Sequence, residues 1–393
     1  MSYTLSKSLN AGGNIVTEEI LSMLDTDGSP IKVGNEKYTS KGKVAKRYQT
    51  PYGEINIKRH VYQNSKGGKV FCPLEEDARI ITGTTPRFSK QVSSKYSDLG
   101  SSRVQKDLSS NHNRHISREY IRKISESVSE LIERKSKKWD YTIPVENEHV
   151  KSVGISLDGT CMYMSNDGWR PAMVGAIALY DKQGERLYTQ YVAAPPEYGK
   201  QTFYDEFTSD INKIVSQYPT ATKIGVADGA ADNWSFLEKH TTDQTLDFFH
   251  ACEYLGSVSK VRHKNKIKQR EWLSNSCHNL KYNEGGAAEL LKEIKTLLNK
   301  KYSKKNIEII KTSITYFENH LHQMNYYSNI KNNLPIGSGV IEAACKKIVK
   351  QRMCNPGMKW KNNGAKSVLN LRAINNSGDK WEQVWSKIDR YGI

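Results

Sequence analysis

Three carboxylates stand in sequence settings that together could bind divalent metal ions. Asp158 in SVGISLDGT and Asp228 in KIGVADGA each follow a short apolar run. Glu342 in IGSGVIEAACKKIVKQR lies one turn into a segment rich in Lys and Arg, with apolar residues at helical spacing. Carboxylates held together bind Mg²⁺ or Mn²⁺, and two such ions can drive phosphoryl transfer by activating one oxygen and stabilising the leaving one. The three residues are candidate catalytic ligands of two magnesium or manganese ions.

Each carboxylate also has an ordinary explanation when taken alone. Asp158 could simply form an Asp-Gly turn, and Asp228 could cap the helix that follows it. Glu342 could be stabilised by the helix dipole and by pairing with Lys346 four residues later. The elements around these residues decide between the two explanations.

The order of predicted elements between residues 150 and 260 brings the two Asp residues to one edge of a sheet. Apolar and alternating runs predict three strands in an antiparallel meander, a helix, a fourth strand, a helix, a fifth strand and a last helix. This is the ribonuclease H-like order, in which the first strand lies centrally beside the fourth. Those two strands are expected to end at Asp158 and Asp228, and ligand sites of α/β sheets favour that edge. The predicted fold class is therefore α/β, with a ribonuclease H-like mixed five-stranded sheet and helices on both faces.

The remaining segments complete a domain organisation. Residues 265–333 have helical patterns throughout, with a break at Gly285-Gly286, and predict a helical insertion before the last core helix. That last helix is expected from about Ser338 to Met353 and carries Glu342. The predicted parts are an N-terminal region (1–84), a helical region (85–145), the catalytic core (146–264 and 334–373), the insertion (265–333) and a C-terminal helix (374–393).

The N-terminal half contains no candidate catalytic group but offers DNA-binding elements. Gly12-Gly13 predicts a break within the mixed first 40 residues, and alternating residues over 41–72 predict a small β element. Residues 86–136 predict two short helices and a longer basic one, with breaks at Gly100 and at 111–115. This arrangement suits a helix-turn-helix DNA-binding module, and an ordinary helical bundle is the alternative.

Composition indicates a polyanionic partner. The 393 residues include 59 Lys and Arg against 42 Asp and Glu, a net charge of +17, which favours nucleic acid over a small neutral ligand. The six cysteines show neither a CxxC pair nor zinc-finger spacing, so we expect free thiols in a reducing compartment. No signal peptide or membrane-spanning apolar run is apparent, so we expect a cytoplasmic protein without a membrane partner.

Basic residues near Glu342 predict where a DNA backbone would bind. Phosphate contacts come mostly from Lys and Arg side chains, although a solvated helix face is the alternative. His250 follows the fifth strand at the edge of the acids, so it could support the metal site or contact phosphate, or it could be structural. The predicted DNA-binding residues are Lys346, Lys347, Lys350, Arg352, Lys359 and Lys361.

Several segments together resemble bacterial insertion-sequence transposases of the Kra type. The resemblance spans roughly residues 45–385 and is most specific from Ile336 to Arg372. It implies a DDE transposase with a ribonuclease H-like core, a helical insertion before the catalytic Glu and two divalent metals. Asp158, Asp228 and Glu342 match the positions of the three catalytic acids. The segments are YGEINIKRHVYQ…FCPLEED, SLDGT, VADGA…NW, LDFFHACEYL, PIGSGVIEAACKKIVKQRM and GMKWKNNGAKSVLNLRA.

The resemblance implies metal-dependent cleavage at transposon ends and strand transfer into target DNA. The expected partners are double-stranded DNA, as terminal inverted repeats and target, and further copies of the chain in a homo-oligomer. Two rival functions stay open. One is a non-catalytic DNA-binding protein derived from a transposase, and the other is a ribonuclease H-like structure-specific nuclease.

Overall fold

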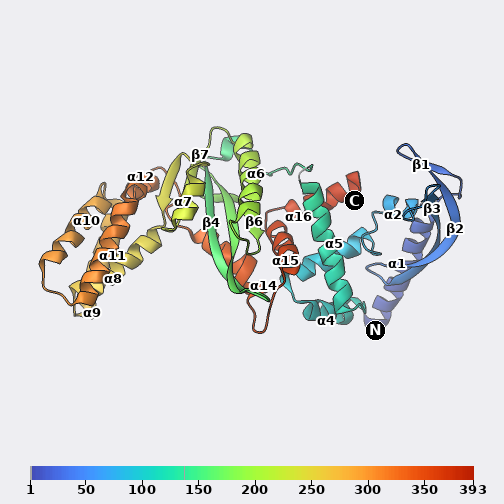
Figure 1. Ribbon diagram of the computed structural model, residues 1–393, viewed down its shortest axis with the longest axis horizontal. Coiled ribbons are helices and arrows are strands. Elements are labelled where there is room, and N and C mark those ends of the chain that lie inside the picture. Colours follow the sequence, from blue (N-terminus) through green and yellow to red (C-terminus); the bar gives the residue numbers. More distant parts are fainter. Residues whose placement is uncertain (1, 137) are drawn as a thin grey trace. The chain divides into compact units, whose positions relative to one another are not determined.

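The computed structural model describes residues 2–136 and 138–393 as two compact units (Figure 1). One unit combines Met1–Thr142 with Lys361–Ile393, and the other is Ile143–Trp360. The sequence predicts residues 334–373 within the catalytic core, whereas this division groups the segment from Lys361 onward with the N-terminal residues. All three candidate acids belong to the second unit.

The second unit is built on a mixed five-stranded sheet of strand order β6-β5-β4-β7-β8. The first three strands form an antiparallel meander, and β7 and β8 add in parallel beside β4. The first strand is therefore central and lies beside the fourth, as the sequence predicts. The strands are β4 (Ser152–Met164), β5 (Gly168–Tyr180), β6 (Arg186–Ala194), β7 (Thr222–Ala227) and β8 (Asp243–Leu246).

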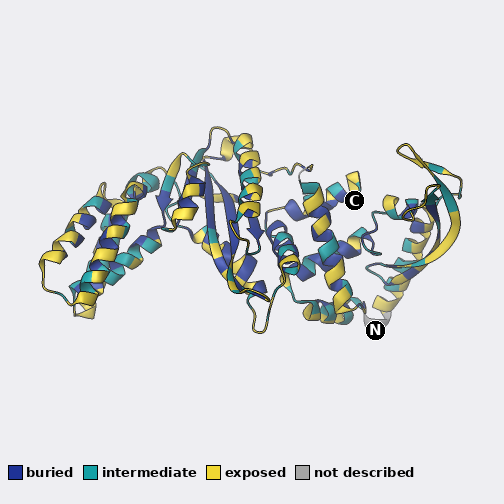
Figure 2. Cartoon of the chain, in the orientation of Figure 1, coloured by how far each residue is buried: buried dark blue, intermediate teal, exposed yellow. Residues whose placement is uncertain are grey.

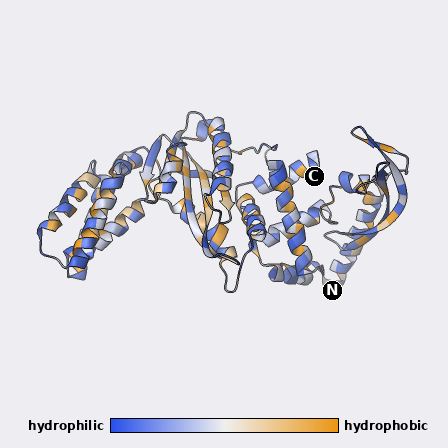
Figure 3. Ribbon diagram, in the orientation of Figure 1, coloured by the Kyte–Doolittle hydropathy of each residue, from blue (hydrophilic) through white to orange (hydrophobic). Residues whose placement is uncertain are grey.

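Helices cover both faces of this sheet. Alternate residues of β4 point to opposite faces, so each face of the strand packs against a different helix. Val153, Ile155 and Leu157 share a hydrophobic core with Phe203 and Phe207 of α6 (Gln201–Gln217). Asp158 takes the next position in the alternation and faces the other side. Figure 2 shows that the central strands are buried, and Figure 3 shows their apolar residues. Asp158 itself is half-buried, although the residues before it in β4 are buried.

The strand that carries Asp158 is longer than the sequence predicts. We expected it to end at Asp158, but β4 continues to Met164, and Asp158 pairs with Val174 of β5. The antiparallel pairing with β5 runs the whole length of β4, which is why the Asp-Gly sequence does not turn the chain here. The parallel pairing with β7 stops at Ile155. Asp158 is therefore a mid-strand residue that lies beyond the parallel part of the sheet.

Residues 265–333 form the predicted helical insertion, which follows α8 (Phe248–Arg262) and α7 (Ala231–Leu237) in the chain (Figure 1). The predicted break lies between α9 and α10, where Gly285 adopts a φ of +74° that favours glycine. Helices α8 and α11 pack against each other. The helices of the insertion are α9 (Lys266–Tyr282), α10 (Gly286–Thr296), α11 (Lys304–His320) and α12 (Tyr326–Lys331), with 3₁₀ turns at Leu297–Asn299 and Leu321–Gln323.

The helix that carries Glu342 is continuous but not uniformly α-helical. It consists of α13 (Gly339–Ala344), a π-helical turn (Cys345–Lys350) and α14 (Gln351–Met353). The predicted apolar face is largely buried, and only Val340 in it is half-buried. Its buried residues are Ile341, Ala344, Cys345, Ile348 and Val349. A π-turn holds one residue more than an α-turn and is often found at functional sites.

The first unit contains a three-stranded antiparallel sheet, packed against α1, and a group of helices. The predicted break at Gly12-Gly13 is wrong, because α1 continues through both glycines. A Cβ at Gly13 would lie 2.5 Å from Cγ of Tyr52, so this glycine allows a close contact and does not end the helix. The elements are α1 (Ser2–Met23), β1 (Ile31–Val33), β2 (Glu36–Gln49), β3 (Glu54–Asn64) and α2 (Pro73–Asp77).

The predicted helical region of the first unit is confirmed as a set of helices with the expected breaks. Gly100 precedes α4, and Asn113 ends it in the left-handed conformation. Arg372 of α15 binds Asp98 at 2.7 Å and so fixes α15 to the end of α3. None of the helices in the described residues is long and apolar enough to cross a membrane. The helices are α3 (Pro86–Asp98), α4 (Ser101–His112), α5 (Arg118–Ser136), α15 (Asn362–Asn375) and α16 (Lys380–Tyr391).

The close contact between β5 and α6 gives a test of how the sheet is packed. A Cβ at Gly175, the partner of Leu157 across the sheet, would lie 2.7 Å from Cε2 of Phe207. We expect Gly175→Ala to lower the free energy of unfolding in urea by about 1–3 kcal/mol, the usual effect of overpacking. Gly339→Ala is the control, because no heavy atom lies within 4 Å of its added Cβ. Equal stability of the two variants would contradict this packing.

Candidate metal centre

The register of the parallel strands places three aspartates at one level of the sheet. Pairing joins β4 to β7 at residues 70 positions apart, such as Ser152 and Thr222, and the same interval separates Asp158 from Asp228. Pairing joins β7 to β8 at residues 19 positions apart, and the same interval separates Asp228 from Asp247. Asp228 and Asp247 thus directly follow the ends of β7 and β8 at corresponding positions, and Asp158 lies at the corresponding position of β4, beyond its last pair with β7.

Asp247 is the buried member of this row and is fully enclosed. Its Oδ1 accepts the backbone N–H of His250 at 2.7 Å, so it caps the N-terminus of α8. Its Oδ2 accepts the backbone N–H of Ser338, the residue before α13. Its own backbone N–H donates to Ala227 at the end of β7. This one residue therefore connects β7, α8 and the start of the helix that carries Glu342.

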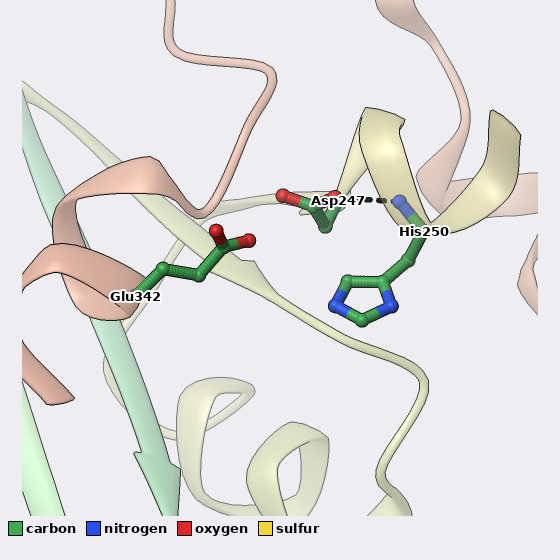
Figure 4. A group of neighbouring side chains, drawn as sticks. All are labelled: Asp247, His250 and Glu342. Atoms are coloured by element: carbon green, nitrogen blue, oxygen red, sulfur yellow. Dashed lines mark hydrogen bonds between the residues drawn. The ribbon is translucent and has the colours of Figure 1, made fainter. Parts of the chain in front are cut away.

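Asp247, His250 and Glu342 form a group that could hold a metal ion (Figure 4). Each offers one ligand atom, and these atoms all lie within 4.8 Å of one another. Glu342 is exposed and its Oε1 accepts the Ser338 hydroxyl at 3.0 Å, which orients the side chain. His250 is half-buried, and its Nδ1 lies 3.6 Å from Oε2 of Glu253. Oxygen and imidazole ligands of this kind suit several divalent metals, so the donor set alone does not select one.

Asp158 and Asp228 adjoin this group. Burial raises the pKa of Asp158 and the negative charge of Asp228 raises it further, whereas the Gly159 N–H, the Cys345 thiol and the charge of His250 lower it. The pKa is higher in the folded protein, so the fold binds this proton more tightly than the unfolded chain. As the pH rises above the ordinary pKa of a carboxyl group, the ionisation of Asp158 therefore lowers the free energy of unfolding. A bound cation would relieve this repulsion, which is the electrostatic fit expected of a metal site.

The oxygen atoms of Asp158 and Asp228 have defined partners. Asp158 Oδ1 accepts the N–H of Gly159 at 2.6 Å, and its Oδ2 lies 3.6 Å from the buried Cys345 thiol. Asp228 accepts the Ala230 N–H and an Asn233 amide hydrogen, both at Oδ1. Among the described residues this leaves Asp228 Oδ2 available to a cation.

The structure brings two of the four predicted residues of the metal site into the metal-binding group. Glu342 and His250 lie within the metal-binding group. Asp158 and Asp228 interact with each other through their charges. Among the described residues, neither of these two aspartates belongs to the group whose ligand atoms lie within 4.8 Å of one another. Asp247 was not predicted, because the apolar run QTLDFF suggests a strand up to His250. In the structure β8 ends at Leu246. An Asp three residues before His250 is an N-cap signal that marks the helix start.

The predicted DNA-binding residues differ in their exposure. Lys346, Lys347, Lys350 and Lys359 are exposed in the second unit, and Lys361 is exposed in the first. Arg352 differs from the expected surface position, because it is only 2% exposed and its guanidinium lies 5.3 Å from the ring centroid of Trp360. Arg352 follows the buried residues Ile341, Cys345 and Ile348 at helical spacing, so it lies on the buried side of the helix.

The two hydrogen bonds to Asp247 give a test of its positioning role. In Asp247→Asn, the amide group would direct a donor at one of the two backbone N–H groups. We expect the free energy of unfolding to fall by about 1–3 kcal/mol, the cost of a buried group without its partner. Asp243→Asn, exposed at the start of β8, should change it by less than about 0.5 kcal/mol. Urea denaturation of both variants measures the difference, and a stable Asp247→Asn protein would refute the role.

The metal-binding group gives a second test that does not depend on activity. Mn²⁺ at about 100 times its dissociation constant should stabilise the protein by about 2.7 kcal/mol, since binding to the folded state alone shifts the folding equilibrium. Glu342→Gln and His250→Ala should reduce the increase in melting temperature, and the exposed Glu238→Gln should not. The same increase in all four proteins would place Mn²⁺ elsewhere.

Comparison with known proteins identifies a family but no activity. A search of curated proteins gives no match to the chain. A family model described as an uncharacterised protein family, UPF0236, matches residues 2–388. That match includes both units and every residue of the candidate metal centre. The chain therefore belongs to the uncharacterised protein family UPF0236.

Proposed function

We propose that this protein is a DDE-type DNA transposase with a ribonuclease H-like core, which cleaves DNA at transposon ends and joins the ends to target DNA. The observation that carries the proposal is that Asp158 of β4 and Asp228, directly after the neighbouring strand β7, occupy corresponding positions, with Glu342 on the helix whose Cys345 contacts Asp158. The strand order of the sheet and the resemblance to Kra-type transposases support the same function.

In this proposal the acids hold two magnesium or manganese ions. Asp158, Asp228 and Glu342 are the ligands, and Asp247 and His250 lie beside them. When bound, the ions would supply Lewis-acid activation of the attacking oxygen and stabilise the leaving one. Asp247 fixes the start of α13 through Ser338, and Cys345 contacts Asp158 from the same helix. These contacts hold the carboxylates in position before substrate binds, and such preorganisation lowers the barrier to reaction.

The basic residues after Glu342 support a nucleic-acid substrate. Lys346, Lys347 and Lys350 are exposed on the turn that follows the candidate ligand. Lysines bind phosphates along a DNA backbone without reading its sequence. They would therefore hold the strand on either side of the phosphodiester that faces the acids. A homo-oligomer on two DNA ends remains part of the proposal.

The two rival functions make different predictions in the same assay. A DNA-binding protein without catalysis would bind element ends without metal-dependent nicking. A structure-specific nuclease would prefer a four-way junction over a linear end. The concentration of carboxylates at one sheet edge favours catalysis over binding alone, because acids repel a DNA backbone unless cations neutralise them.

Cleavage of linear duplex DNA carrying the flanked element ends tests the function. With Mg²⁺ or Mn²⁺, the wild type should cut at the element end and transfer the strand. Asp158→Asn, Asp228→Asn and Glu342→Gln should each lower the rate at least about 100-fold, because each removes a direct ligand. End binding should persist in all three, since their substitutions do not remove positive charge.

Asp232→Asn is the matched control, because this exposed carboxylate lies one turn after Asp228 on α7. It should cleave at the wild-type rate. Undiminished cleavage by Asp158→Asn would refute the proposed site. Cleavage of a four-way junction in preference to the element end would favour the structure-specific nuclease.

A further inference from the structure

A second feature of this unit lies directly beside the candidate acids. A cleft of about 680 Å³ opens between α8 and α11, and Gly229, the residue after Asp228, forms part of its wall. Tyr254 lines the cleft from α8, one turn beyond His250. The helical insertion therefore forms a wall of the cleft next to the metal centre, and it is more than a spacer between β8 and α13.

One face of α11 provides the polar lining of the cleft. Lys304, Glu308 and Lys311 follow one another at intervals of four and three residues, so they lie on the same side of the helix. Asn319 and His320 continue the lining at the other end of the helix. The two lysines are about 10 Å apart along the helix axis, since each residue advances about 1.5 Å. Flexible lysine side chains at this separation can reach neighbouring phosphates of one nucleic-acid strand.

Stacked aromatic rings form the inner wall of the cleft. The rings of Tyr254 and Tyr316 are stacked, with centroids 3.8 Å apart. A Cβ at Gly229 would lie 2.7 Å from Cε2 of Tyr316, so the glycine lets the chain after Asp228 approach this ring. Burial raises the pKa of Tyr316, as do the charges of Asp228, Asp247 and Glu253. The phenol therefore stays neutral at physiological pH and does not repel an anionic ligand.

We propose that this cleft binds the nucleotides of the DNA strand that adjoin the phosphodiester held at the acids. Lys304 and Lys311 bind their phosphates, and a base or sugar lies against Tyr254 and His320. The inference rests on the proposed function for the position of the scissile phosphate, but the cleft itself is defined by its own residues. Aromatic faces accept any base, so the cleft binds strand without reading sequence.

Photo-crosslinking separates this cleft from the other basic surfaces. A single-stranded oligonucleotide with 5-iodouracil is bound to the full chain in Ca²⁺, irradiated, digested and analysed by mass spectrometry. We expect the adduct on Tyr254 or His320. Lys304→Ala with Lys311→Ala should remove most of it and weaken binding about tenfold. The slope of the logarithm of the binding constant against the logarithm of the salt concentration should become shallower by about 1.4 in the double variant, since each single-strand phosphate contact contributes about 0.7.

Two variants of α11 control for general damage to the helix. Lys305→Ala removes an exposed lysine that does not line the cleft, and should change binding less than twofold. Glu308→Gln removes the one acid between the two lysines and should strengthen binding. Adducts only outside the cleft, or equal binding by the double variant and Lys305→Ala, would overturn the inference.

The same experiment keeps this inference apart from the proposed function. Asp228→Asn should abolish cleavage but leave the adduct in place. A wild type that crosslinks in the cleft and never cuts with Mg²⁺ would refute the transposase and leave the nucleotide site standing. A wild type that cuts the element end without an adduct in the cleft would refute the nucleotide site alone. An RNA oligonucleotide that crosslinks more strongly than DNA would reject DNA as the ligand.

Discussion

A single buried carboxylate holds together the unit that contains the candidate metal centre. Asp247 accepts backbone N–H groups from α8 and from the segment that enters α13, and its own N–H continues the ladder from β7. The insertion of α9 to α12 separates these elements widely in the sequence, so the chain has to return to the sheet at a defined place. A charged acceptor with two fixed donors gives that return a specific geometry.

The second unit carries negative and positive charges in neighbouring places. Carboxylates gather at one sheet edge, where burial and mutual repulsion raise the pKa of Asp158. Exposed lysines follow on the next helix turn and on α11. A polyanion alone would be repelled at the edge, and a cation alone would gain nothing from the positive charge of the lysines. A cation and a phosphodiester together satisfy both, and this complementarity links the metal centre to its proposed substrate.

The sequence predicts the sheet order because each strand forms a distinct apolar or alternating run, and these runs are separated by turns or amphipathic helices. It could not predict the length of β4, since the Asp-Gly pair at 158–159 is a turn signal that the pairing with β5 overrides. Asp247 was not predicted as a site residue, because its neighbours are apolar and their pattern favours a strand. Gly13 looked like a break, yet the ring of Tyr52 lies over it. In each case a tertiary contact overrides a local preference.

The proximity of Glu342 and Asp247 was beyond prediction for a related reason. Their separation in sequence depends on the length of the insertion, and only the return of the chain at Ser338 brings them together. Arg352 is a different case, because its spacing from Ile341, Cys345 and Ile348 is that of one helix face. Its charge suggested a surface position, and its packing against the ring of Trp360 overrides that preference.

This π-turn sets the direction in which the end of the last core helix faces relative to Glu342. Conversion to regular α-helix would rotate everything after it by about 100° relative to Glu342, the angle that one residue occupies. Arg352 would leave the ring of Trp360, whose backbone pairs with Tyr163 and Ser165 near the far end of β4. A change in winding at the acids is thereby coupled to the opposite end of the same strand. The winding of this one turn therefore fixes both the position of Arg352 and the place where the chain rejoins β4.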